Sequence, residues 1–127
     1  MTKYTIELSE DQMRLIADCL EDVSRFAAGQ WAMQHMIEAM VEGLPFDEQL
    51  ERRHKAEELL KQVKRVLAPE FPDNGGLGYN GTKFIGNTYQ IYRSILHKVA
   101  VDNNWNNTYS SSALPSGDMG TIKIVKL

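Results

Sequence analysis

The feature that most constrains the fold is an unbroken helical pattern that follows Ser9. Ser9 is a favourable N-cap, and Gln12 three residues later completes a capping-box pattern. No proline interrupts the pattern, and Gly29 is its only weak point up to residue 41. We therefore expect one helix over residues 10–41. At 1.5 Å per residue it would be roughly 48 Å long, whereas a chain of this length folds into a body roughly 36 Å across.

The second half of this expected helix lacks a polar face. Over residues 13–26 apolar positions are opposed by charged ones, but over residues 27–41 the only ionisable side chains are His35 and Glu38. A helix that is apolar all round must be buried all round, which the remaining helices of one short chain cannot easily achieve. Length and pattern together predict a homo-oligomer that assembles through this helix. The alternative is a sandwich formed within a single chain.

Two further helices and two strands complete the expected fold. Apolar stripes predict helices over residues 46–67 and 84–101, the first with a densely charged opposite face. Alternating residues at 3–8 and 121–127 predict two strands, which would satisfy their backbones by pairing with each other. We expect one α+β, mostly α, domain over residues 1–127, with long antiparallel helices and a small sheet.

Charge, hydropathy and cysteine content narrow the range of functions. The net charge of −3 argues against a nucleic-acid polymer as partner, because binding to the phosphate backbone needs a basic face. No run of 18 apolar residues predicts a membrane span, and the N-terminal residues lack the apolar core of a signal peptide. The single cysteine, Cys19, is expected to be a buried core thiol. We therefore expect a cytoplasmic protein that contacts no membrane.

The chain contains none of the common catalytic or metal-binding motifs. Glu51 and His54 have the Glu-x-x-His spacing of carboxylate-bridged iron sites, but no second copy accompanies them. Residues 76–81 match Gly-x-Gly-x-x-Gly, yet a helix and two prolines precede them where a dinucleotide-binding fold requires a strand. We therefore expect a binding protein and not an enzyme, with no metal and no cofactor.

The part of the chain best suited to bind a ligand covers residues 71–109. It contains seven asparagines and seven aromatic residues, and aromatic rings stack on bases while asparagine amides pair with base edges. Its glycine-rich loop leads into a helix N-terminus, which offers backbone N–H groups to phosphate. The basic residues that would balance phosphate charge are Lys83, Arg93, His97 and Lys98. An ordinary turn-rich connection is the alternative interpretation.

Several short motifs resemble one known family. The motifs are Tyr4 to Gln12, Arg25 to Gln30 in the first helix, the glycine-rich loop, Thr88 to Arg93, and Leu114 to Gly117. In this order they are similar to the type I Thoeris anti-defence proteins of bacteriophages and metagenomes. The resemblance covers most of the chain by order of elements.

This resemblance implies a sponge that binds a cyclic nucleotide immune signal without cleaving it, and so blocks bacterial anti-phage defence. The implied ligand is a cyclic ADP-ribose isomer, with cyclic di- or trinucleotides as further candidates. The family forms antiparallel helical dimers that can assemble into hexamers. Lys83 is added to the residues that the resemblance implies, because its charge could balance that of phosphate. The predicted ligand-binding residues are then Phe71, Asn74, Tyr79, Asn80, Lys83, Phe84, Asn87 and Arg93.

The sequence also departs from the family. No arginine follows Arg93, so Lys123 or Lys126 would have to supply the C-terminal basic contribution. A second interpretation is a helical, oligomeric protein–protein interaction module of a phage that has no small-molecule ligand.

Overall fold

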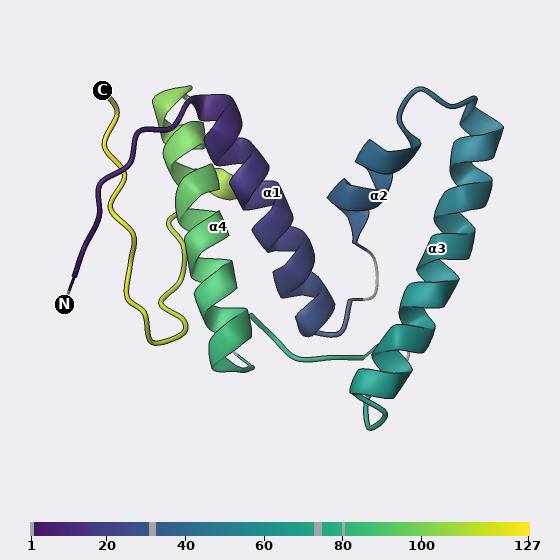
Figure 1. Ribbon diagram of the computed structural model, residues 1–127. Helices are drawn as coiled ribbons and strands as arrows, with labels where there is room; N and C mark the ends of the chain where they lie inside the picture. Colours follow the sequence, from purple (N-terminus) through teal and green to yellow (C-terminus); the bar gives the residue numbers. More distant parts are fainter. Residues whose placement is uncertain (1, 31–32, 73–74, 80) are drawn as a thin grey trace.

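The computed structural model describes residues 2–30, 33–72, 75–79 and 81–127, and four α-helices form within these ranges (Figure 1). The helices are α1 (Glu10–Ala27), α2 (Gln34–Val41), α3 (Phe46–Leu67) and α4 (Lys83–Asp102), followed by a short 3-10 turn, η1 (Thr108–Ser110). Helix α4 packs along α1, while α2 contacts both α1 and α3. The segment between α3 and α4 crosses from one helix pair to the other (Figure 1).

The start of α1 and the bounds of α3 and α4 agree with the sequence. The Ser9 hydroxyl accepts a hydrogen bond from the Gln12 amide at 3.1 Å, and the Gln12 side chain accepts one from the Ser9 amide at 2.9 Å. This confirms the predicted capping box. The helices predicted over residues 46–67 and 84–101 are also confirmed to within one residue.

The prediction of one helix over residues 10–41 is wrong. The chain leaves α1 after Ala27, and α2 runs back in the opposite direction from Gln34 (Figure 1). The physical reason lies at Gly29, which adopts a φ of +106° that no helical residue takes. Because the helix is divided, its length no longer argues for an oligomer.

The carboxylate of Asp22 holds the start of α2 against α1. Its two oxygens accept hydrogen bonds from the backbone amides of His35 and Met36, at 3.1 and 2.8 Å. Asp22 therefore replaces the side-chain cap that α2 lacks at Met33. A carboxylate at a helix N-terminus also suits the helix dipole.

Gly29→Ala is expected to lower the free energy of unfolding by about 2–3 kcal/mol. The new Cβ would lie 2.6 Å from Cα of Gly76 and 2.7 Å from the Gly75 oxygen, in a backbone conformation already unfavourable for alanine. Urea denaturation measures the change. Gly43→Ala is the matched control, because φ there is +85° but nothing lies within 4 Å of the added Cβ. Equal losses in the two variants would show that the contact with the loop does not matter.

The predicted sheet is also wrong, since no strand forms among the described residues. The segments at 3–8 and 121–127 are drawn without strand arrows, and no backbone hydrogen bond is found that joins them (Figure 1). Only Ile124 of these segments packs against the core, whereas Tyr4 is 89% exposed. The alternating side chains have no apolar surface to cover within one chain, and an isolated two-stranded pair is unstable in water.

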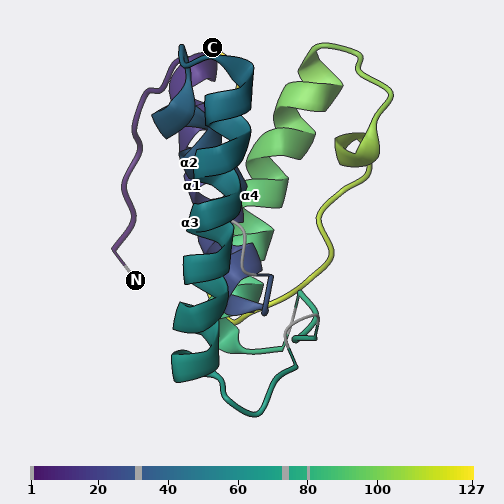
Figure 2. The same ribbon diagram turned by 90° about the vertical axis from the view of Figure 1, so that its right-hand side faces the viewer.

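The core is small and lies between α1 and α4. Its centre consists of Ala17, Tyr92 and Ile95, and Ile85 and Val99 extend the buried face of α4. These α4 positions are spaced by seven, three and four residues, which places them on one helix face toward α1. The two helices therefore form one packed pair, and seen from the side of α3, both α3 and α2 lie in front of α1 (Figure 2).

Helix α3 presents its apolar stripe to solvent and a basic residue to the interior. Lys64 is buried, and its Nζ donates to the carbonyl oxygens of Pro72 and Gly75 at 3.0 and 2.7 Å. Val63 and Val66 lie on the outward side, and Val66 is 79% exposed. Other exposed apolar residues of this helix are Leu59 and Leu67. Of the stripe that the sequence predicts, Leu50 and Leu60 are partly buried, and the other members remain exposed among the described residues.

Helix α1 has a second exposed apolar surface. Cys19, predicted to be a core thiol, is exposed, and Leu15 and Val23, four residues away on either side, are exposed as well. The reason is that α1 uses only one side, around Ala17, to pack on α4. None of the helices in the described ranges is long and apolar enough to cross a membrane.

The accessible surface is large for the mass of the chain. It measures 8991 Å² for 14.4 kDa, whereas a compact monomer of this mass exposes about 6,800 Å². The excess of roughly 2,200 Å² is well above the 800 Å² that each partner buries in a standard protein–protein interface. The exposed stripes on α3 and α1 and the extended terminal segments contribute to it.

Candidate functional site

Three of the predicted ligand-binding residues lie together at the N-terminal end of α4. Thr82 caps this helix, because its hydroxyl accepts a hydrogen bond from the Ile85 amide at 3.1 Å. Lys83 and Phe84 occupy the first turn, and Phe84 is 54% exposed. Asn87 follows one turn later. The first turn of a helix directs its N–H groups outward, so this end carries partial positive charge.

Tyr79, which precedes α4, places a second aromatic ring against this helix. Its ring packs on that of Tyr89 with centroids 4.8 Å apart, and Tyr89 in turn meets Tyr92 edge-on at 5.6 Å. Tyr79 is thereby held against the helix. Tyr79 itself remains partly exposed.

The side chain of Asn87 is occupied by the C-terminal segment. Its Oδ1 accepts hydrogen bonds from the amides of Asp118 and Met119, both at 3.0 Å, and its Nδ2 donates to Asp118. Gly117 packs so closely on this amide that an added Cβ would lie 2.1 Å from Oδ1. In this state Asn87 anchors a turn and does not present its amide to a ligand.

Asn87→Leu is expected to release this turn and to lower the free energy of unfolding by about 1–3 kcal/mol, because three hydrogen bonds are lost. Hydrogen exchange at the amides of Asp118 and Met119 reports the release directly, and both should exchange faster. Asn107→Leu is the matched control, since its side chain caps only the Tyr109 amide. Unchanged protection at Asp118 in Asn87→Leu would contradict the anchoring role.

Arg93 is not brought to the same end of the helix. Its guanidinium lies over the Tyr109 ring at 4.9 Å and donates to the Thr108 carbonyl at 3.2 Å. Ten residues separate it from Lys83, which is about 15 Å along a helix. Arg93 therefore holds η1 in place, and the prediction that it joins the loop residues in one protomer is not supported by its contacts.

The glycine-rich loop is packed against the rest of the chain more closely than expected. The Leu77 amide donates to the Ala28 carbonyl at 2.6 Å, and an added Cβ at Gly76 would lie 2.0 Å from the same oxygen. Phe71 is partly buried in the turn that starts this connection. The predicted residues Asn74 and Asn80 lie outside the described residues. The glycines at 75 and 76 thus allow close packing on α1 and against Pro72, which explains them without a phosphate.

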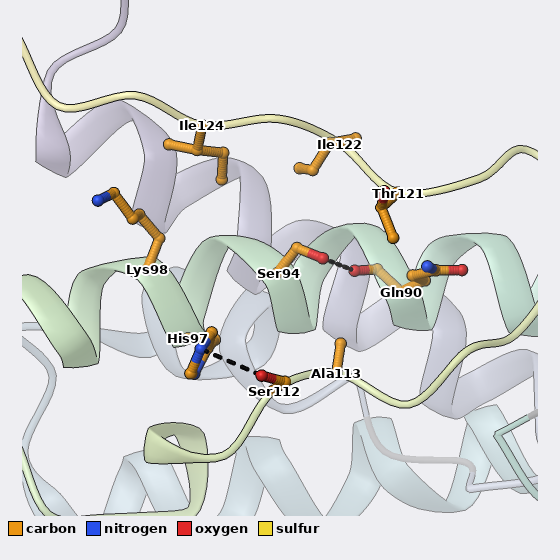
Figure 3. Close-up of a pocket in the computed structure, with 9 residues that line it drawn as sticks. All are labelled: Gln90, Ser94, His97, Lys98, Ser112, Ala113, Thr121, Ile122 and Ile124. Atoms are coloured by element: carbon orange, nitrogen blue, oxygen red, sulfur yellow. Dashed lines mark hydrogen bonds between the residues drawn. The ribbon is translucent and has the colours of Figure 1, made fainter.

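A shallow groove of about 250 Å³ lies between α4 and the C-terminal segment (Figure 3). Ile122 and Ile124 lie on one side of it, and polar α4 side chains on the other (Figure 3). His97 donates from Nδ1 to the Tyr109 carbonyl, and Lys98 pairs with Asp102 at 2.9 Å. Small-molecule pockets are usually 300–1,000 Å³. The groove is therefore too small to enclose a cyclic nucleotide, and its two basic residues already have partners.

An ionic cluster links α1 to α2 and to η1. Glu21 is only 5% exposed, and its Oε1 lies 2.6 Å from Nε2 of His35. Its Oε2 accepts from Arg25 at 3.2 Å and from the Tyr109 hydroxyl at 3.3 Å. Oδ1 of Asp18 lies 3.9 Å from the same histidine nitrogen. One buried carboxylate thus joins three parts of the chain.

This cluster shifts several pKa values. Partial burial acts to lower the pKa of His35, but the hydrogen bond to Glu21 and the nearby carboxylates outweigh it and raise that pKa above 6.5. Burial raises the pKa of Tyr92 to about 12, and the charge of Glu21 adds to this. The pKa of Tyr109 is raised for the same two reasons. Both phenols are therefore neutral near pH 7.

The sequence argument overlooked this cluster. Asp18, Glu21 and Arg25 recur on one face of α1, and His35 is one of only two ionisable residues in the apolar segment. Such a lone histidine in apolar surroundings needs a partner, but a partner on α1 can be identified only once α2 folds back.

Comparisons with known proteins identify no relative or structural neighbour of this chain. No family model, no curated protein and no solved structure matches it. The likeness to the type I Thoeris anti-defence family therefore depends on the short motifs quoted above.

Proposed function

We propose that this protein is a homo-oligomeric binding protein that captures a cyclic nucleotide signal, a cyclic ADP-ribose isomer, and holds it uncleaved. The sequence motifs supply the ligand class. The site we propose is the N-terminal end of α4, with Phe84 and Lys83 as its first contacts. Capture would keep the signal from its effector and so block anti-phage defence.

The observation that carries the proposal is the exposure of Phe84. A phenylalanine that is half exposed beside a helix N-terminus and a lysine offers a stacking surface next to positive charge. Lys83 pairs with Asp118 at 3.2 Å, but both side chains are largely exposed. Exposed ion pairs contribute little to the free energy of folding. A phosphate can therefore replace Asp118 as the partner of Lys83 at a small cost in free energy.

Oligomerisation would complete this site. A sponge must hold its ligand well below the signalling concentration, and a nanomolar dissociation constant corresponds to about −12 kcal/mol. One exposed ring and one lysine do not supply that much, whereas a pocket closed by a second chain can exclude water and strengthen the phosphate contacts. The uncovered stripe of α3 and the excess accessible surface support such an assembly.

The carboxylate that contacts this end of α4 does not suit acid–base chemistry. Hydrogen bonds from Asn87 and then from Lys83 lower the pKa of Asp118, so it stays ionised near pH 7. A general acid would need a raised pKa. Asp118 is therefore no candidate for a general acid.

The experiment is a capture-and-release assay. The protein is incubated with a cyclic ADP-ribose isomer, the free ligand is measured in a filtrate, and the protein is then denatured by heat. We expect depletion of the free ligand and its recovery chemically unchanged. An undiminished free ligand would overturn the proposal, and recovery of a cleaved product would reassign the protein to the nucleotide hydrolases.

The exposed apolar stripe of α3 also favours a second candidate, a protein–protein interaction module without a small-molecule ligand. In that case the stripe would be the functional surface and the α4 end would be irrelevant. Substitution of Phe84 would then leave function intact, whereas for a sponge it should reduce capture. Substitution of Val66 should impair function in both cases.

A further inference from the structure

We propose that Asp18, Glu21 and His35 bind one divalent transition-metal ion, with Zn²⁺ as the best match. One ligand atom from each side chain, namely a carboxylate oxygen from Asp18 and from Glu21 and Nε2 of His35, lies within 4.8 Å of the other two. The site is distinct from the proposed nucleotide site on α4. It draws its ligands from α1 and α2.

The donor set has the chemistry that zinc prefers. Histidine nitrogen and carboxylate oxygen are both common zinc ligands, and three protein ligands leave a fourth position for water. Asp18 and Glu21 are three residues apart on α1, so they share one face of that helix. His35 approaches them from the first turn of α2. The three ligand atoms therefore come from two helices that contact each other.

The position of Glu21 is fixed by outer contacts. Its second oxygen, Oε2, accepts hydrogen bonds from Arg25 and from the Tyr109 hydroxyl, which leaves Oε1 directed at His35. Metal-binding carboxylates in proteins are typically oriented by such partners. Because Glu21 is almost fully buried, its rotamer is restricted before any ion arrives.

The local charge favours a divalent cation in this cluster. Asp18, Glu21 and Asp22 contribute three negative charges within the cluster and at its edge, and Arg25 contributes one positive charge. With His35 neutral the balance is −2. A divalent ion would balance both remaining negative charges and would bind Asp18, Glu21 and His35 together.

Calorimetric titration of the chelator-treated full chain with ZnCl₂ tests the site. We expect one Zn²⁺ per chain, confirmed by elemental analysis, and a higher Tm in its presence. His35→Ala should weaken binding by more than the roughly 10- to 100-fold that loss of an outer contact costs. Tyr109→Phe, which removes only such a contact, should fall within that range.

His54→Ala is the matched control, because His54 is an exposed histidine of α3 outside the cluster, and it should bind Zn²⁺ like the parent chain. Circular dichroism verifies that each variant is folded, and Asp18→Asn provides a second ligand variant at a half-buried position. Absence of one-to-one binding, or equal affinity in the His35→Ala and parent proteins, would overturn the proposal. Neither outcome depends on nucleotide capture.

Discussion

Phe84→Ala is expected to weaken capture of a cyclic ADP-ribose isomer by about 5- to 150-fold, because stacking of a base on an aromatic ring contributes about 1–3 kcal/mol. The ring is half exposed in the protomer, so its removal should change the free energy of unfolding by no more than a few tenths of a kcal/mol. Calorimetric titration with the ligand gives the affinity, and urea denaturation gives the stability.

Tyr4→Ala is the matched control for this variant. Tyr4 is also an exposed aromatic residue, but it belongs to the extended N-terminal segment and not to α4. It should bind the ligand like the parent protein. If Phe84→Ala retains full affinity, the α4 end is not the nucleotide site, and the interaction-module interpretation gains support.

The second large effect concerns assembly. Val63→Glu combined with Val66→Glu is expected to convert the proposed oligomer to a 14.4 kDa monomer. The two valines lie four and seven residues beyond Leu59 on the exposed stripe of α3, and burying two unpaired carboxylates in an interface costs several kcal/mol. Light scattering after gel filtration measures the mass. Capture of the nucleotide should fall with it if the partner chain completes the site.

The control for assembly is His54→Glu, which introduces a negative charge on α3 away from the stripe. About half a turn separates this position from the line through Leu59, Val63 and Val66. This variant should keep the mass of the parent assembly. A parent chain that is already a monomer would remove the argument from the exposed stripe.

The helices of this fold could be predicted where the signal is local. Ser9 and Gln12 specify their own capping box, and continuous apolar stripes fixed both ends of α3 and α4. The break after Ala27 was not predictable in the same way. A single glycine costs a helix only about 1 kcal/mol, and Gly29 ends α1 because the distant residues Gly75 and Gly76 pack against it.

Two further differences between prediction and structure concern the ligand-binding residues and the sheet. Lys83 was predicted to bind ligand because of its charge, and Asn87 because of the family resemblance. In the structure both side chains contact Asp118 of the C-terminal turn, which no local pattern predicts. The sheet failed because the alternating pattern at residues 3–8 shows only that one side is apolar, not that this chain has a surface to cover it. The partners of Lys83 and Asn87, and the surface that the strands would need, lie far away in the sequence. A local pattern could not reveal them.

Native mass spectrometry of the protein mixed with a cyclic ADP-ribose isomer tests the central proposal most directly. We predict an assembly whose mass is a multiple of 14.4 kDa and which carries the intact ligand. A single chain at 14.4 kDa with no nucleotide bound would contradict it.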